Sequence, residues 1–138
     1  MILSLIKGAK DEIQVLAYIL TPQASAFIAG LERAAARGVK ITLIVNDLAS
    51  LDEDIKRRLL ELSSAFPHVR VVDFGGATGA RLHAKAVVVD RSKAVVGSAN
   101  LSYGGMVANY EIGALIEGEE AWNLGELIDL LVQLRKDR

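Results

Sequence analysis

The chain has 138 residues, of which 51% are hydrophobic and 24% are charged, a size and composition typical of one compact domain with a sizeable core and not of a disordered or fibrous protein. Its 16 Lys and Arg against 17 Asp and Glu give a formal net charge of -1, so it lacks the global basic field that helps many nucleic-acid binders. The absence of cysteine excludes disulfides, thiol nucleophiles and cysteine-based metal sites.

The opening sequence MILSLIKGAK reaches Lys7 too early to hold the apolar core of a secretory signal, and no uninterrupted apolar run approaches about 18 residues. We therefore expect a cytoplasmic protein without stable membrane association. Residues 1–138 are expected to form one domain, because no linker, repeat or low-complexity segment interrupts them. A domain cut from a longer parent also fits, since MILSLIKGAK has the pattern of the tail of a longer first helix.

The first half of the chain alternates between buried strands and amphipathic helices. Strands are predicted at 13–20, 39–46 and 69–74, each a short apolar run rich in strand-forming residues. The first intervening helix ends at Arg37-Gly38, which supplies a last-turn cation and a C-terminal glycine, and the second begins near Ser50 with an acidic first turn. This order predicts right-handed crossovers between parallel strands.

The second half of the chain changes character after a glycine-rich loop at 75–80. The segment RLHAKAVVVDRSKAVVGSAN, at 81–100, has the pattern of a hairpin, and a strand-like stretch follows at 107–117. The chain then ends in a long amphipathic helix whose apolar residues are Trp122, Leu127, Ile128, Leu131 and Leu134. We therefore predict an α/β fold with a mixed, largely parallel β-sheet flanked by helices on both faces.

The hairpin carries polar residues at the start of its first strand and at the end of its second strand. Side chains alternate between the faces of a strand, so His83 and Lys85 point the same way, and so do Ser98 and Asn100. If the turn is centred between positions 91 and 92, positions that sum to 183 lie opposite each other. His83 then faces Asn100 and Lys85 faces Ser98, which predicts one polar cluster on one face. A turn of odd length would shift this pairing.

The residue types of this cluster suit phosphoryl chemistry without a metal. A lysine ammonium, a serine hydroxyl and an asparagine amide donate hydrogen bonds to phosphate oxygens, and a histidine acts near neutral pH as nucleophile, base or acid. Further along, Asn109 and Glu111 are two residues apart in the strand-like stretch. A carboxylate such as Glu111 can accept the Nδ1 proton of a catalytic histidine and fix its tautomer.

The positions of these residues match a known pattern at every fixed position. His83-x-Lys85, four residues to Asp90 and six more to Gly97-Ser98-x-Asn100 resembles the HxK(x)4D(x)6GSxN motif of the phospholipase D superfamily. The resemblance extends over most of the chain, including AKDEI before the first strand, ARGVKITLIV, and NYEIG after the motif. It implies a phospholipase D/nuclease-like fold.

The superfamily's catalytic unit holds two copies of the motif, whereas this sequence holds one. It is therefore similar to the small single-motif endonuclease-type members, in which two identical chains build one active site. The resemblance implies a homodimer that needs no metal or cofactor, with His83 as the nucleophile through a phosphohistidine and the partner's His83 as acid and then base. It assigns phosphate binding to Lys85, Ser98 and Asn100, orientation of His83 to Glu111, and structural support to Asp90, Gly97 and Asn109.

From this resemblance we expect the protein to be a metal-independent phosphodiesterase that acts on nucleic acid, either DNA or RNA. A phospholipid phosphodiesterase or transferase uses the same chemistry, but the sequence offers no apolar or basic segment for membrane docking. A third hypothesis is a nucleic-acid-binding or dimerisation module of a larger restriction, repair or helicase protein. The intact motif favours an enzyme over a purely structural module.

The other residues with chemical potential are interpreted as structural. We expect His68 to be a satisfied structural histidine, and the acidic residues 52–54 to favour a helix start and not to bind a metal. Arg91 and Lys93 lie at the predicted turn and are expected to be solvated. Trp122 is expected to pack in the core or at a dimer contact.

Overall fold

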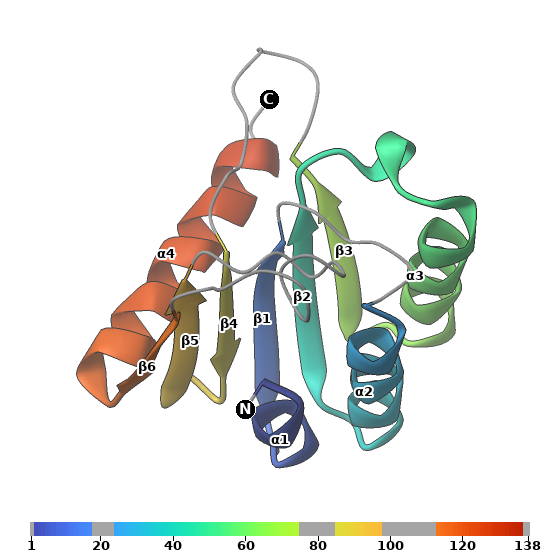
Figure 1. The fold of residues 1–138 in the computed structure, drawn as a ribbon. Coiled ribbons are helices and arrows are strands. Elements are labelled where there is room, and N and C mark those ends of the chain that lie inside the picture. Colours follow the sequence, from blue (N-terminus) through green and yellow to red (C-terminus); the bar gives the residue numbers. More distant parts are fainter. Residues whose placement is uncertain (1, 18–23, 75–84, 98–112, 137–138) are drawn as a thin grey trace.

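The computed structural model describes residues 2–17, 24–74, 85–97 and 113–136. Their strands form a six-stranded sheet of order β3-β2-β1-β4-β5-β6. The strands are β1 (Glu12–Ala17), β2 (Lys40–Val45), β3 (Val69–Asp73), β4 (Ala86–Val89), β5 (Lys93–Gly97) and β6 (Gly113–Glu117). β1, β2 and β3 are parallel neighbours, and the pairings from β1 to β4, β5 and β6 are antiparallel. The predicted mixed sheet is confirmed, and its parallel part is confined to β1–β3 (Figure 1).

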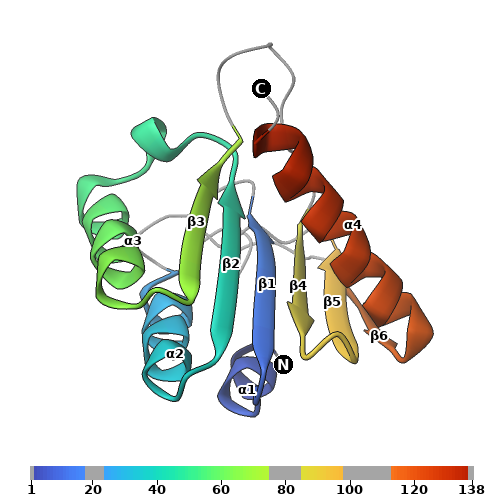
Figure 2. The same ribbon diagram turned by 180° about the vertical axis from the view of Figure 1, so that it is seen from behind.

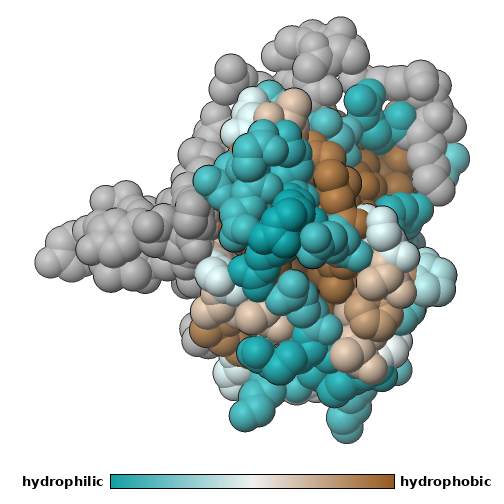
Figure 3. All heavy atoms as spheres, turned by 90° about the vertical axis from the view of Figure 1, so that its right-hand side faces the viewer, coloured by the Kyte–Doolittle hydropathy of each residue, from teal (hydrophilic) through white to brown (hydrophobic). Residues whose placement is uncertain are grey.

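Helices cover both faces of this sheet, as predicted. One face packs against α1 (Ile2–Lys7), α2 (Ser25–Ala36) and α3 (Glu53–Ala65), while α4 (Glu119–Lys136) crosses the other face over β4 and β5 (Figure 2). A short 3-10 helix, η2 (Leu48–Ser50), follows β2. Seen from the side of β3 and α3, hydrophilic residues cover much of the outer surface, with a band of apolar residues alongside (Figure 3).

The alternation of side chains in the central strands divides the core into two layers. Ile13 and Val15 of β1 belong to the layer under α1–α3, and Leu16 belongs to the layer under α4. Burial on both faces explains why β1 and β2 are nearly continuous apolar runs. Gln14 and Thr42 are the buried polar residues recorded in the described part of the chain.

The helix ends follow the predicted local chemistry. The carboxylate of Asp52 caps α3 by accepting hydrogen bonds from the backbone N–H groups of Asp54 (3.0 Å) and Ile55 (3.3 Å). The prediction that this acidic segment starts a helix is therefore confirmed. Gly38, which follows the C-cap residue Arg37 of α2, has a φ of +91°, a conformation that glycine adopts without the strain of a side chain.

The apolar face predicted for the last helix is only partly right. Of its five predicted residues, Ile128 is buried, but Trp122, Leu127 and Leu134 are 52%, 51% and 58% exposed. Of the two expectations for Trp122, packing in the core is therefore wrong, and a dimer contact stays a prediction. α4 buries Ala121, Ile128 and Val132 against the sheet, with Leu124 and Leu131 partly buried beside them. Because a single helix lies on this face of the described structure, no second helix covers its far side.

Candidate active site

The register of the β4–β5 hairpin differs from the predicted register by one residue. The paired residues sum to 182 and not to 183, as in Ala86↔Val96 and Val89↔Lys93. The turn contains three residues, 90–92, and both Asp90 (φ 53°) and Arg91 (φ 51°) adopt the left-handed conformation. The ladder therefore does not supply the predicted pairing of Lys85 with Ser98.

Three residues of the motif lie within the described structure. Lys85 directly precedes β4 and is half-buried, and Gly97 is the last residue of β5. The Gly97 N–H donates a hydrogen bond to the Lys85 carbonyl oxygen at 3.4 Å, so these two residues share one end of the hairpin. Asp90 lies at the turn, the opposite end. The remaining predicted site residues, His83, Ser98, Asn100, Asn109 and Glu111, lie outside the described residues.

The sheet topology brings Lys85 to the edge at which sites of α/β proteins usually form. β4 runs antiparallel to β1, with Ala86 beside Leu16 and Val89 beside Ile13. The start of β4 therefore lies next to the carboxyl end of β1, and β2 and β3 end at the same edge because they are parallel to β1 (Figure 1). In open α/β sheets, ligands bind outside the carboxyl ends of such strands.

Asp90 joins the hairpin turn to the entry of β1. Its carboxylate accepts hydrogen bonds from the backbone N–H groups of Lys10 (3.0 Å), Asp11 (2.7 Å) and Glu12 (2.9 Å). Burial raises the pKa of the Asp90 carboxyl, but these three donors together outweigh it, so the pKa lies below its ordinary value. The motif's aspartate thus stabilises a contact between segments about 80 residues apart.

Arg91 is the centre of an ion-pair network, so the expectation that it is solvated is wrong. Its guanidinium donates hydrogen bonds to Glu12 (2.9 Å) and Asp129, and to the more exposed Glu126 (3.0 Å). The bond to Glu12, followed by that to Asp129, raises its pKa above the ordinary value. The guanidinium carbon also lies 5.4 Å from the centre of the Trp122 ring, within the range of a cation–π interaction.

Sequence reasoning missed this network because its members come from three separate segments. The available signal was the pair of acids at Glu126 and Asp129, three residues apart on one side of a predicted helix. The hairpin is therefore tied to β1 and to α4 at its turn. Lys93, at the same end of the hairpin, is exposed as expected.

His68 has the structural role that the sequence predicts. Its Nε2 lies 2.9 Å from the carbonyl oxygen of Ala35, and its ring lies against that of Phe66 at a centroid distance of 5.3 Å. These contacts join the start of β3 to the end of α2. His68 therefore offers a control histidine for tests of His83.

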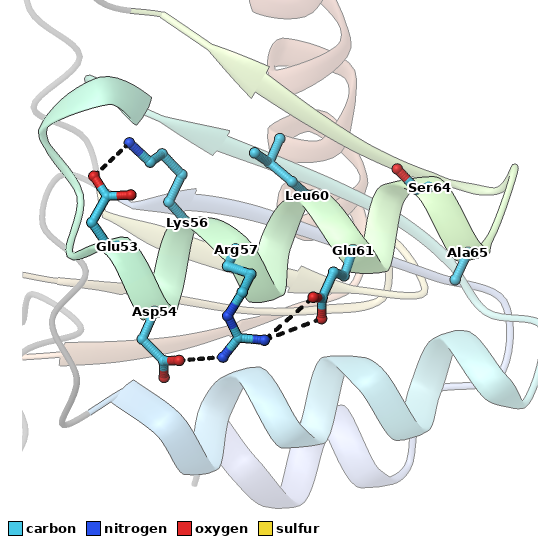
Figure 4. Close-up of a pocket in the computed structure, with 8 residues that line it drawn as sticks. All are labelled: Glu53, Asp54, Lys56, Arg57, Leu60, Glu61, Ser64 and Ala65. Atoms are coloured by element: carbon cyan, nitrogen blue, oxygen red, sulfur yellow. Dashed lines mark hydrogen bonds and ion pairs between the residues drawn. The ribbon is translucent and has the colours of Figure 1, made fainter.

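The exposed side of α3 bears a surface hollow of about 920 Å³ lined by residues of that helix alone. Its charges are paired with one another: Lys56 with Glu53, and Arg57 with both Asp54 and Glu61 (Figure 4). These are pairs three or four residues apart, the usual pattern of a solvated helix face. Among the residues that the structure describes, no three His, Cys, Asp or Glu side chains form a metal-binding group.

Three solved structures share this arrangement of sheet and helices. NucT from Helicobacter pylori matches with a TM-score of 0.77 and 19% identity over 96% of this chain and 85% of its own. Nuc from Salmonella typhimurium, a phospholipase D family member, matches at 0.70 and 22% over 99% and 83%. Polyphosphate kinase from Porphyromonas gingivalis matches at 0.66 and 22% over 94% and 23%. The fold is thus that of a phospholipase D-type α/β domain.

Sequence comparisons, unlike the fold alone, identify the family of the chain. The chain belongs to the family described as "Cardiolipin synthase, PLD-like domain", whose model matches residues 2–128, and hence to the phospholipase D superfamily of phosphodiesterases. It is also 36% identical over 118 residues to the DISARM protein DrmC of Bacillus paralicheniformis. That match covers 84% of this chain and 48% of DrmC, so the chain spans about half the length of this relative. In the described residues, no helix is long and apolar enough to cross a membrane.

Proposed function

We propose that the chain is a metal-independent phosphodiesterase that cleaves nucleic acid at a site shared by two copies. Two observations carry the proposal: the complete motif in the sequence, from His83 to Asn100, and the position of the described hairpin, whose end at Lys85 and Gly97 lies at the carboxyl edge of the parallel strands. The fold shared with NucT and Nuc supports this reading, and the family supports phosphodiester chemistry.

In the proposed reaction, the His83 imidazole attacks phosphorus, forming a P–N bond as the P–O bond to the leaving group breaks. The partner's His83 gives its proton to the leaving oxygen. It then takes a proton from water, which attacks phosphorus and breaks the P–N bond, so that free His83 is restored. One motif per chain supplies one such histidine, which is why the proposal needs two chains.

The other residues of the motif have distinct proposed roles. Lys85, Ser98 and Asn100 hold the phosphate oxygens, and the ammonium of Lys85 stabilises the negative charge that builds up in the transition state. Glu111 accepts the Nδ1 proton of His83 and fixes its tautomer. Because these groups supply the charge stabilisation, the reaction is proposed to proceed without a metal.

Two other functions remain as alternatives. The family description includes cardiolipin synthase, which favours a phospholipid phosphodiesterase or transferase as the second candidate. The third is a nucleic-acid-binding or dimerisation module of a larger protein, since the chain spans about half of DrmC. Only the second shares the proposed chemistry.

The test is a panel of single-stranded and double-stranded DNA, RNA, a small phosphodiester and phospholipid vesicles, each incubated with the protein in EDTA. We expect nucleic-acid cleavage that survives EDTA, is lost in His83→Ala and is kept in the control His68→Gln. Cleavage of phospholipid alone would establish the second candidate. Activity that is abolished by EDTA and restored by magnesium or manganese would contradict the proposed metal independence.

A further inference from the structure

α1 and α2 pack side by side and leave a groove between them (Figure 1). Its volume is about 620 Å³, a size typical of small-molecule sites. Ser4 and Lys7 line it from α1, and Arg33 and Arg37 line it from α2 and its C-terminal end. Small residues of α2, including Gly30, lie between them. We call this space the α1–α2 groove.

The described residues that line the α1–α2 groove include three bases and no acid. Arg33 and Arg37 are four residues apart, about one helical turn, and Lys7 lies across the groove on α1. In the part of the chain that the structure describes, no carboxylate forms an ion pair with any of the three. A concave surface with one sign of charge attracts the opposite charge, here an anion.

The hollow on α3 shows the contrast with a solvated helix face. Its described lining holds two bases and three acids, a net charge of -1, and its bases Lys56 and Arg57 are both paired. The helix dipole accounts for one base in the last turn of α1 and one in the last turn of α2. It does not account for three unpaired cations around one groove.

Arg37 is held in place before any ligand binds. Its Nη2 donates hydrogen bonds to the carbonyl oxygens of Ile6 and Ala9, both at 3.1 Å. These two bonds leave the N–H groups on Nε and Nη1 unused, because a guanidinium has five N–H donors. A cation that is already ordered binds an anion at a lower entropic cost. The hydroxyl of Ser4 adds a further donor to the same groove.

The rest of the lining favours a nucleotide over a phospholipid. Leu3 and the small residues of α2 offer an apolar surface for a sugar or a base. Leu3 is the one large apolar side chain among the described lining residues, so the groove offers little surface for fatty-acid chains.

We propose that the α1–α2 groove binds the phosphate group of a nucleotide, either a free nucleotide or one within a nucleic-acid strand. Lys7, Arg33 and Arg37 hold the phosphate in both cases. Lys7 and Arg37 lie shortly before β1 and β2, and the six residues of β1 span about 20 Å. The groove is therefore separate from the edge at which Lys85 precedes β4. The choice of a nucleotide rests on the proposed function.

The test measures binding in a His83→Ala background, in which the probe is not consumed. The probe is a fluorescent DNA strand of about 20 nucleotides, and its affinity is measured at several salt concentrations. The double variant Lys7→Gln, Arg33→Gln removes two unpaired cations and keeps Arg37, which binds the end of α1. The matched control Lys56→Gln, Arg57→Gln removes two paired cations from α3.

We expect the groove variant to bind the strand about tenfold more weakly at low salt, and the control to bind it like the parent protein. The slope of log affinity against log salt should fall by about 1.4, at about 0.7 for each lost contact with a single-strand phosphate. Equal affinities and slopes for parent, groove variant and control would overturn binding of a strand in the groove.

A second probe, AMP, separates the two sources of the phosphate. AMP binding that is about tenfold weaker in the groove variant would identify a free nucleotide as a ligand. Loss of strand binding alone would identify the strand. If neither probe binds, or neither depends on Lys7 and Arg33, the proposal is wrong. It is also wrong if only phosphatidylglycerol vesicles bind through these two residues.

The result is independent of cleavage, because binding is measured without His83. Binding through the groove by a protein that cleaves no substrate would contradict the proposed function and leave this inference standing. Cleavage of nucleic acid with no role for Lys7 and Arg33 in binding would do the reverse.

Discussion

The two ends of the β4–β5 hairpin use the residues of one motif differently. At the turn, the Asp90 carboxylate accepts hydrogen bonds from three backbone N–H groups at the entry of β1. The adjacent Arg91 binds carboxylates of β1 and α4. At the other end, Lys85 and Gly97 share a main-chain hydrogen bond at the carboxyl edge of the parallel strands. The spacing from Lys85 to Gly97 thus corresponds to the length of the hairpin.

We expect this difference to separate positions whose loss affects the fold from positions whose loss affects the proposed reaction. Asp90 belongs to the motif, yet the hydrogen bonds that its carboxylate accepts all come from backbone N–H groups. The proposed catalytic roles belong to residues at or beyond the open end. Substitutions at the turn should therefore lower the stability of the fold and leave the rate almost unchanged. Substitutions at the open end should lower the rate and leave the stability almost unchanged.

The largest expected effect is at His83. His83→Ala should lower the rate of phosphodiester cleavage by about 1000-fold or more, because it removes the proposed nucleophile, while the midpoint of thermal unfolding stays unchanged. Asp90→Asn should instead lower the midpoint of thermal unfolding and leave the rate per folded molecule almost unchanged. Single-turnover cleavage and thermal unfolding measure the two quantities. If folded Asp90→Asn is as inactive as His83→Ala, the proposed difference between the turn and the open end of the hairpin is wrong.

The next effect is at Arg91. Arg91→Met should lower the free energy of unfolding by about 2–3 kcal/mol, because it leaves Glu12 with the more distant Lys40 ammonium, 3.8 Å away, as its cation. The side chains of Arg91 and Glu12 are both only 14% exposed. Glu126→Gln is the control: its side chain is 55% exposed, and its loss should cost about 0.5 kcal/mol or less. Equal effects in urea unfolding would show that Arg91 acts only as an exposed ion pair.

Asp90→Asn should have a smaller effect on stability that depends on pH. Asparagine tolerates the positive φ of this position, so the substitution removes mainly the charge, at a cost of about 1–2 kcal/mol at pH 7. The folded pKa is lowered, so this stabilisation is present above the unfolded pKa of about 3.9 and is lost as the pH falls through the folded pKa. A difference in unfolding free energy that grows towards acid pH would contradict the assignment.

The smallest expected effect is at Gly125, where α4 passes the hairpin and β1. A Cβ there would lie 2.8 Å from Oε1 of buried Gln14 and 3.2 Å from Cγ of Arg91, so Gly125→Ala should destabilise the fold by about 1 kcal/mol despite alanine's helix propensity. Gly30→Ala, whose Cβ meets only Ile6 Cγ2 at 3.4 Å, is the control and should be neutral or stabilising. Equal unfolding midpoints for the two variants would refute this close approach.

Most of the fold could be predicted from local patterns. The three parallel strands, the cap at Asp52 and the structural role of His68 follow from apolar runs, helix-start chemistry and the rarity of functional lone histidines. The turn register could not, because a three-residue turn with positive φ at Asp90 and Arg91 has no glycine to signal it. The buried face of α4 was also unpredictable in detail, because apolar residues occupy more than one side of the helix.

The candidate site could be predicted as a motif but not as a geometry. The resemblance to the superfamily's motif identifies the residues from His83 to Asn100, and the structure adds that Lys85 and Gly97 lie at the carboxyl edge of the parallel strands. The Arg91 network depends on contacts between β1, the hairpin and α4, which sequence separation hides. The roles in the site stay predictions for His83, Lys85, Ser98, Asn100, Asn109 and Glu111.

The most direct test of the shared site is the activity of dimers that contain one wild-type chain and one His83→Ala chain. Two different affinity tags allow these mixed dimers to be purified and their cleavage rate compared with that of wild-type dimers. One shared site needs both histidines, so we predict a near-complete loss of activity in the mixed dimer. Half of the wild-type activity would show that each chain works alone and would contradict the shared site.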